Sequence, residues 1–146
     1  MSETFEAADP NYQTRVRESF ARQGAMLHLG ATIASLSPGR CEIALPFRSE
    51  LSQQHGYFHA GMLSAIVDSA GGYAALTLFP AGSEVLTVEF KLNLIAPADG
   101  ALLVAEGKVV RSGRTLTVCT GEVRSLKDGA QKVCAIMQQT LIRIAS

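Results

Sequence analysis

The chain has 146 residues, and its 13 basic and 13 acidic side chains give a formal net charge of zero. This balance provides no basic field for holding nucleic acid or an anionic membrane surface. The N-terminus has no apolar core, which argues against a signal peptide, and no run approaches the ~18 to 20 apolar residues of a membrane span. We therefore expect a single cytoplasmic domain over residues 1–146, with a buried core and no nucleic-acid or membrane partner.

The first predicted element is a short amphipathic helix that follows a loose tail at residues 1–8. Asp9 is suited to cap this helix and Pro10 to occupy its first position. Apolar side chains recur at every fourth position over residues 12–20, and Gly24 provides a stop. From Met26 onward the pattern becomes strand-like.

The remaining chain is dominated by segments with strand character, namely 41–47, 85–95, 101–111, 114–124 and 131–144. Turn signals separate the last four, and Asp128-Gly129 between two β-rich runs is a strong hairpin signal. In the segment 85–95, strict alternation places the side chains of Thr87 and Glu89 on the face opposite to Leu86, Val88 and Phe90. Together with one long helix, these segments predict an α+β fold with an antiparallel sheet.

The three cysteines lie far apart in the sequence at Cys41, Cys119 and Cys134. Their odd number and wide spacing argue against a disulfide framework and against a cysteine-rich zinc site. Since all three belong to strand-like segments, we expect them to be small core residues rather than nucleophiles.

The long helix is predicted over residues 59–78 and has two unlike faces. One is mainly apolar and suited to packing on a sheet, and it collects Met62, Leu63, Ile66, Ala70, Tyr73 and Ala74. The other is built from small residues and one carboxylate, namely Gly61, Ser64, Ala65, Asp68, Gly71, Gly72 and Ala75. Small residues allow another body to come close, which could be a second helix, a twin subunit or a ligand.

Apart from the histidines, Asp68 is the only residue with a formal charge between Leu51 and Ser83. A carboxylate kept in such a segment indicates a shielded cleft or interface, although a structural hydrogen bond to a loop is an equally ordinary explanation. His55 and His59 are four residues apart, but only Asp68 could join them, and a zinc site needs three or four ligands. The pattern favours a structural role for at least one histidine over a metal site.

The segment QQHGYFHAGMLSAIVD resembles the hotdog-fold acyl-CoA thioesterases. Its His59-Ala60-Gly61 motif is followed nine residues later by Asp68 and preceded six residues earlier by Gln53. The chain is most similar to the PaaI-like (phenylacetate-degradation-type) branch and to 4-hydroxybenzoyl-CoA thioesterases, over roughly residues 27–142. EFKLNLIAPA and VVRSGRTLTVCTGEV also resemble family patterns. The family usually has His-Gly-Gly where this chain has His59-Ala60-Gly61. If that position acts through its backbone N–H, Ala60 serves nearly as well, unless the conformation of the glycine is required.

This resemblance implies a hotdog fold and a catalytic set of Asp68, Gln53, Ala60, Gly61, Thr87 and His59. Asp68 would act as general base or nucleophile, and the N–H groups at the helix start would bind the thioester oxygen. Gln53 would hydrogen-bond the carbonyl or the water, and Thr87 would lie near the water. For Thr87, an ordinary strand residue is the equally weighted alternative.

The resemblance also implies an acyl-CoA substrate, no cofactor and a homodimer or homotetramer. The helices of two subunits would pair, so that Asp68 faces Gln53 and Ala60 of the other chain. The arginines flanking the turn Ser112-Gly113 are candidates for the CoA phosphates. The candidate substrate-binding residues are Arg111, Arg114, Tyr57, Phe58 and Leu63. A solvated arginine pair and core aromatic residues are the plainer alternatives.

Three other functions compete with thioester hydrolysis. A hydratase or dehydratase of the same fold would combine His55 or His59 with a carboxylate. A non-catalytic acyl-CoA sensor would bind without turnover, and a structural dimer module would bind no ligand. The retained Asp68 and the preceding amide of Gln53 favour hydrolysis.

Overall fold

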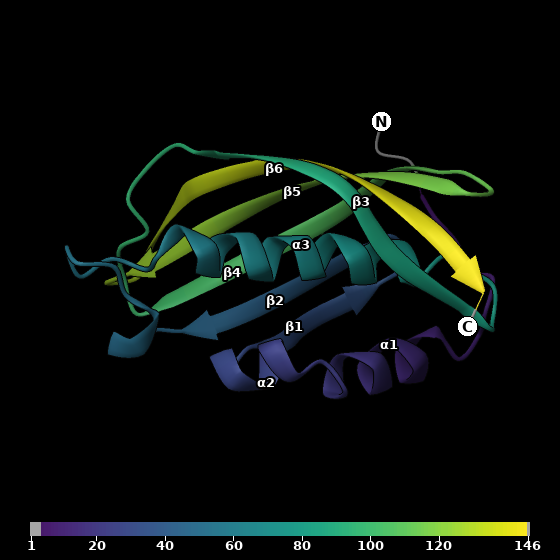
Figure 1. Ribbon diagram of the computed structural model, residues 1–146, viewed down its shortest axis with the longest axis horizontal. Helices are drawn as coiled ribbons and strands as arrows, with labels where there is room; N and C mark the ends of the chain where they lie inside the picture. The colour runs from purple at the N-terminus through teal and green to yellow at the C-terminus, as the bar shows by residue number, and fades with distance from the viewer. Residues whose placement is uncertain (1–3, 146) are drawn as a thin grey trace.

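The computed structural model describes residues 4–145, which form a six-stranded antiparallel sheet curled around one long helix, α3 (Figure 1). The helical elements are α1 (Tyr12–Ala21), α2 (Gly24–Leu29), the 3-10 turn η1 (Ser49–Leu51) and α3 (Ala60–Leu76). The strands are β1 (Thr32–Ser37), β2 (Arg40–Pro46), β3 (Ser83–Leu94), β4 (Leu102–Ser112), β5 (Leu116–Lys127) and β6 (Ala130–Ala145). Their order in the sheet is β1-β2-β4-β5-β6-β3, which confirms the predicted α+β layout.

The core lies between α3 and the concave face of the sheet. Alternate side chains of β2 and β4 point into it, so that Ile43 and Leu103 are fully buried against helix residues such as Ile66. Gly107 on β4 lies directly under the backbone of α3, and a Cβ atom there would come within 2.6 Å of the Ala70 carbonyl oxygen. The helix and the sheet therefore meet at a separation that only glycine permits.

All three cysteines are buried, which confirms that they are core residues. Burial raises the pKa of Cys41 and of Cys119 to about 12, and it raises the pKa of Cys134 as well. Because the thiolate is the nucleophilic form, these thiols are poor nucleophiles at neutral pH. Among the described residues, no helix is long and apolar enough to cross a bilayer.

A β-bulge at Val88 corrects the expected alternation of β3. Thr87 pairs with Leu141, whereas Glu89 pairs with Thr140, so the register shifts by one residue between them. A bulge reverses the faces on which the following side chains lie. Thr87 therefore points toward α3, on the same face as Phe90, and the prediction that it opposes Phe90 is wrong.

The N-terminal helix starts and ends at residues other than those predicted. It begins at Tyr12, and Asp9 accepts a hydrogen bond from the backbone N–H of Asn11 (2.9 Å) without capping the helix itself. Gly24 does not end a helix but starts α2, which includes Met26. The helix ends at Leu29, and its C-cap is Gly30, whose φ is 84°. The strand-like pattern thus begins later than predicted.

The predicted loose tail, residues 1–8, falls partly outside the described residues, because residues 1–3 are not among them. Within the described part, the ring of Phe5 packs against the core and lies over Gly39. An aromatic contact of this kind ties the segment to the fold, so the prediction of a loose tail is wrong at Phe5.

The C-terminal end of α3 is held in place by α1. The Arg15 guanidinium donates hydrogen bonds to the carbonyl oxygens of Leu76 (2.9 Å), Phe79 (2.8 Å) and Pro80 (2.6 Å). Carbonyls at a helix end lack intrahelical partners, so a cation there satisfies them and interacts favourably with the helix dipole. The ring of Tyr73 also packs edge-on against Phe20, with ring centroids 5.8 Å apart.

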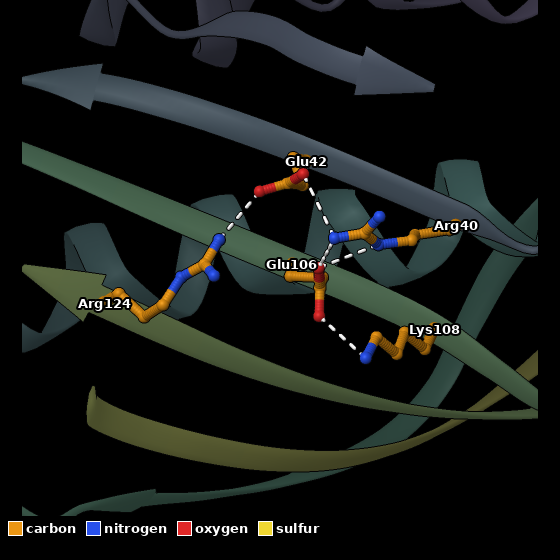
Figure 2. A network of polar contacts seen from close by, with 5 residues as sticks. All are labelled: Arg40, Glu42, Glu106, Lys108 and Arg124. Carbon is orange, nitrogen blue, oxygen red and sulfur yellow. Dashed lines mark hydrogen bonds and ion pairs between the residues drawn. The ribbon is translucent and has the colours of Figure 1, made fainter. Parts of the chain in front are cut away.

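The convex face of the sheet, turned away from α3, carries a network of ion pairs across β2, β4 and β5 (Figure 2). Arg40 contacts Glu42 and Glu106, Lys108 pairs with Glu106 (3.1 Å), and Arg124 pairs with Glu42 (2.7 Å). Burial by itself would raise the pKa of Glu106, but the hydrogen bonds from Arg40 and Lys108 outweigh it and hold that pKa below its ordinary value. The network ties three strands together.

Candidate active site

Asp68 lies at the middle of α3 and is half-buried. Its carboxylate accepts hydrogen bonds from side chains on two strands, β3 and β6. Thr87 on β3 donates its hydroxyl to Oδ1 at 2.7 Å. Gln139 on β6 donates its amide Nε2 to the same Oδ1 at 2.5 Å and to the Asp68 backbone carbonyl at 3.1 Å. The structure thus brings Thr87 to Asp68, and it adds Gln139, which sequence reasoning missed.

Gln139 is only 1% exposed, although a polar amide is unusual in a core. It occupies an inward position of β6 between the buried residues Met137 and Leu141. That placement is the signal that could have identified it, because alternation along 131–144 puts an amide where an apolar residue is expected. Its partner could not be read from the sequence, since Asp68 is 71 residues away.

The start of α3 is shaped by His59, which is its N-cap. The ring Nδ1 of His59 accepts the backbone N–H of Gly61 at 2.8 Å, so Nδ1 carries no proton in this arrangement. The N–H of Met62 is bonded to the His59 carbonyl. Within the described chain, the Ala60 N–H is left without a partner, so of the two predicted oxyanion donors only Ala60 is free.

Gln53 begins the turn that leads into α3. Its side-chain carbonyl oxygen accepts the backbone N–H groups of His55 (2.5 Å) and Tyr57 (3.3 Å), an arrangement that fixes the orientation of the amide. Because the oxygen faces the turn, the NH₂ group points away from it. Gln53 therefore offers a fixed donor beside the helix start.

A groove of about 640 Å³ lies beside the start of α3, and it is lined by most of the predicted catalytic and substrate-binding residues of that region. It is lined by Gln53, Tyr57, Phe58, His59, Ala60 and Leu63, together with the 94–98 segment after β3. Phe58 and Leu63 are also buried in the core, so they form the floor of the groove. The lining is mainly apolar with a few polar groups, which is typical of a small-molecule site.

The two groups of polar residues lie apart in a single chain. Asp68 is eight residues along α3 from Ala60, and a rise of about 1.5 Å per residue separates them by about 12 Å along the helix axis. Thr87 and Gln139 lie with Asp68, whereas Gln53, His59 and Ala60 lie at the helix start. One chain therefore holds two separate groups of candidate site residues.

The small-residue face of α3 is buried in the C-terminal half of the helix and half-buried in the N-terminal half. Toward the C-terminus, Gly71, Gly72 and Ala75 are buried, and a Cβ at Gly71 would collide with the side-chain oxygen of Gln139. The body that comes close to Gly71 and Gly72 is the chain's own strand β6, so the expectation of an outside partner is wrong for these two residues. Figure 1 shows β3 crossing over this half of the helix. Toward the N-terminus, residues 61, 64, 65 and 68 remain half-buried.

Arg111 and Arg114 flank the β4–β5 hairpin and are both exposed. Within residues 4–145 neither forms an ion pair or a side-chain hydrogen bond, which leaves both guanidinium groups free. Figure 1 places this hairpin at the end of the molecule where α3 terminates, opposite the end where α3 begins. His55 is exposed on the turn, and no group of three or more potential metal ligands occurs among the described residues.

The fold agrees with the comparison with known proteins. The family model of the thioesterase superfamily matches residues 55–131, which include α3 and the strands β3, β4 and β5. A candidate esterase of Saccharolobus solfataricus is 32% identical over 115 residues, covering 79% of this chain and 81% of the relative. The chain therefore belongs to the thioesterase superfamily, and the protein is a hydrolase.

Solved structures give the same assignment. A thioesterase family protein from Silicibacter pomeroyi is 46% identical, with a TM-score of 0.91, and the match covers 92% of this chain and 99% of that one. The PaaI protein of E. coli, from the phenylacetic acid degradation operon, has a TM-score of 0.83 over 96% of this chain and 98% of its own. At 18% identity, that second likeness shows the fold alone. The predicted hotdog fold and the resemblance to thioesterases are confirmed, and the likeness to PaaI is one of fold.

Proposed function

We propose that this protein is an acyl-CoA thioesterase whose active site is completed by a second copy of the chain. The observation that carries the proposal is the pair of half-sites: an oriented carboxylate at Asp68, and an unpartnered Ala60 N–H beside the Gln53 amide in an apolar groove. Hydrolysis of a thioester needs both a carboxylate and an oxyanion donor at one carbonyl carbon. A separation of about 12 Å is too long for one chain to supply both.

The half-exposed stripe on α3 favours a symmetric helix pair. Gly61 and Asp68 share one face, and the point midway between them falls between Ser64 and Ala65. In an antiparallel pair with its two-fold axis at that point, Asp68 of each chain lies opposite Gly61 of the partner subunit. Small residues at the crossing point allow the close approach that this geometry needs. Each dimer then contains two equivalent sites.

The edge of the sheet next to the helix supports the same pairing. β3 is the terminal strand, and its residues Leu86, Val88, Phe90 and Leu94 are exposed at 56%, 56%, 42% and 53%. An exposed apolar edge strand is a ready template for pairing with another chain. Covering it with a second β3 would bury these side chains and continue the sheet across the dimer.

In this site Asp68 has one carboxylate oxygen, Oδ2, without a partner among the described residues. As general base, it takes a proton from water while the water oxygen adds to the thioester carbon. The resulting oxyanion accepts the N–H of Ala60 from the partner subunit, and collapse breaks the C–S bond and releases CoA with that proton. As nucleophile, the same oxygen attacks the carbon directly, and the C–S bond breaks to release the CoA thiolate and leave a mixed anhydride. Water then hydrolyses the anhydride, which releases the acid and regenerates the Asp68 carboxylate.

In this proposal the groove binds the acyl half of the substrate, and the free guanidinium groups of Arg111 and Arg114 bind the CoA half. Tyr57, Phe58 and Leu63 provide an apolar wall next to the helix start. In the antiparallel pair, the β4–β5 hairpin of one chain lies toward the start of α3 in the other chain. Arg111 and Arg114 of the first chain then lie at the mouth of the site beside that helix start. Guanidinium groups suit phosphate binding.

The test is hydrolysis of acetyl-, hexanoyl-, palmitoyl- and benzoyl-CoA, with the released thiol trapped by a chromogenic reagent. We expect thiol release from at least one substrate, and loss of that activity in Asp68→Asn. Pairing the best acyl-CoA with its pantetheine thioester, in wild type and in Arg111→Ala/Arg114→Ala, tests the CoA contacts. The double variant should raise KM for the CoA ester only.

Crotonyl-CoA is the control for the competing chemistry. Loss of its enoyl absorbance without thiol release would assign the protein to the hydratases and overturn the proposal. Binding of all four acyl-CoAs with no turnover would instead indicate a sensor.

A further inference from the structure

We infer that Gln139 is a positioning residue, which holds Oδ1 of the Asp68 carboxylate so that Oδ2 is the oxygen that reacts. The inference rests on the proposed function, because it takes Asp68 as the reacting carboxylate. It concerns a residue on β6 that no sequence motif of the family resemblance contains.

The first support is geometric. The Gln139 amide bridges the side chain and the backbone of the same residue, with Nε2 at 2.5 Å from Oδ1 and 3.1 Å from the carbonyl oxygen of Asp68. Thr87 donates to Oδ1 from the other side at 2.7 Å, and Gln139 also lies 3.4 Å from the Thr87 hydroxyl oxygen. Two donors on one oxygen fix the rotation of the carboxylate. Misplacement of a reacting group by ~1 Å can lower a rate about 100-fold.

The orientation of the amide follows from the atoms around it. Nε2 faces three acceptors, namely the carboxylate oxygen, the backbone carbonyl and the threonine hydroxyl. Exchanging the amide oxygen and nitrogen would place Oε1 against the carboxylate and the carbonyl, which is repulsive. Gln139 therefore donates to Asp68.

The second support is that the amide is poorly suited to a purely structural role. Oε1 of Gln139 is buried and has no hydrogen-bond partner among the described residues. A buried polar atom without a partner is unfavourable, and an apolar side chain of the same length would avoid it. Interiors tolerate such atoms mainly where a functional requirement retains them.

The helix is also shaped to receive this amide. Gly71 lies one turn after Asp68 on α3, and a Cβ atom there would collide with Oε1 of Gln139. Glycine is unfavourable in the interior of a helix. Its presence at position 71 allows the amide to reach both the carboxylate and the carbonyl of Asp68.

The test compares Gln139→Met, which keeps the length but cannot donate, with Gln138→Met as matched control. Gln138 is the exposed neighbour on the opposite face of β6. With the best substrate of the four acyl-CoAs, we expect Gln139→Met to lower kcat by ~10- to 100-fold with KM within about 2-fold. The thermal midpoint of Gln139→Met should equal or exceed that of wild type, and Gln138→Met should leave all three quantities unchanged.

A double-mutant cycle distinguishes positioning from a general structural effect. If Gln139 acts through Asp68, adding Gln139→Met to Asp68→Asn should cause no further loss in the single-turnover rate. An equal loss in both backgrounds, or a wild-type kcat in Gln139→Met, would overturn the inference.

Two further outcomes remain informative. If Gln139→Met does not fold, Gly71→Ala displaces the amide by its Cβ and should give the same loss of kcat at constant KM. A wild-type kcat there overturns the inference. If Asp68→Asn itself keeps the wild-type rate, the proposed function fails, whereas an inactive Asp68→Asn beside a fully active Gln139→Met removes only the role of Gln139.

Discussion

At the scale of single residues, His59, Gln53 and Asp68 each have one side-chain atom committed to the fold and one left free. His59 uses Nδ1 to bond the Gly61 N–H, Gln53 uses its side-chain oxygen to bond the turn, and Asp68 uses Oδ1 to accept two donors. The committed atom fixes orientation, so the free atom is presented at a defined angle. Such preorganisation is what lets a polar group act on a transition state without reorganising.

Asp68→Asn tests the carboxylate. The amide oxygen of Asn can still accept from Thr87 and Gln139, so the variant should fold normally, but it is neither a base nor a nucleophile. We expect kcat to fall by ~100-fold or more, with acyl-CoA binding largely retained in a calorimetric titration. A folded variant with the wild-type rate would make Asp68 a structural carboxylate.

Ala60→Pro tests the free N–H without changing a side-chain functional group. Proline is well accommodated at the first position of a helix, and His59 already has φ −65° and ψ 140°, which suits a residue before proline. Removal of one oxyanion donor should lower kcat by ~100- to 1,000-fold. The thermal midpoint, measured in parallel, should change little. Unchanged turnover would exclude this N–H as an oxyanion donor.

At the scale of secondary-structure elements, the position of the site depends on how closely α3 lies on the sheet. Gly107 permits the contact from the β4 side, and Gly71 permits the approach of Gln139 from β6. On the opposite face of the sheet, the ion-pair network holds β2, β4 and β5 in register beneath the helix. The elements thus set the distance between Asp68 and the strand residues that hold it.

Gly107→Ala tests the helix–sheet contact. The new methyl group would collide with the backbone of α3 at Ala70, which cannot move aside as a flexible side chain could. We expect a loss of at least ~1–3 kcal/mol in the free energy of unfolding, measured by urea denaturation. Gly24→Ala is the matched control, because a Cβ atom there meets nothing within 4 Å, and its effect should stay within about 0.5 kcal/mol.

The pH dependence of stability tests the Glu106 network. Because the folded-state pKa of Glu106 is lowered, its contribution to stability is present above the unfolded-state pKa of ~4.3 and is lost as pH falls through the folded-state value. The difference in unfolding free energy between wild type and Glu106→Gln should therefore shrink on acidification from pH 7 to pH 3. Glu122→Gln, at a position that pairs with Glu106 across the strands but forms no ion pair in the described chain, is the control.

At the scale of the whole molecule, the single chain is an incomplete enzyme under the proposed function. Its carboxylate half-site and its oxyanion half-site lie about 12 Å apart along one helix, and its β3 edge is exposed and apolar. A two-fold pairing of α3 and β3 would bring the two kinds of half-site together and would also cover the exposed edge of β3. This pairing makes activity depend on dimerisation.

Subunit complementation tests that dependence. Asp68→Asn and Ala60→Pro chains are each expected to be inactive as homodimers. After unfolding and refolding together in equal amounts, half of the dimers are mixed, and each mixed dimer has one site without either substitution. Activity should recover to about a quarter of the wild-type level if the chains pair at random. No recovery, with mixed dimers demonstrated by mass spectrometry, would show that each site is made by one chain.

Much of the architecture and part of the site could be read from the sequence. Alternation and turn residues indicated the strands, and the apolar face of α3 indicated its packing on the sheet, because both patterns are local and periodic. The carboxylate at Asp68, the preceding amide of Gln53 and the helix start at Ala60 also lie within one continuous segment. Their types and order therefore carried the family resemblance.

Other features were decided by tertiary structure alone. The bulge at Val88 put Thr87 and Phe90 on the same face of β3, and Thr87 contacts Asp68. The packing of β6 on α3 brought Gln139 to the same carboxylate, and the fold of the turn let His59 accept the Gly61 N–H. Each depends on segments that meet only after the chain has folded, or on a register shift that breaks strict alternation. The sequence by itself determined which functional groups are available, and the tertiary contacts determined which of their atoms are free to react.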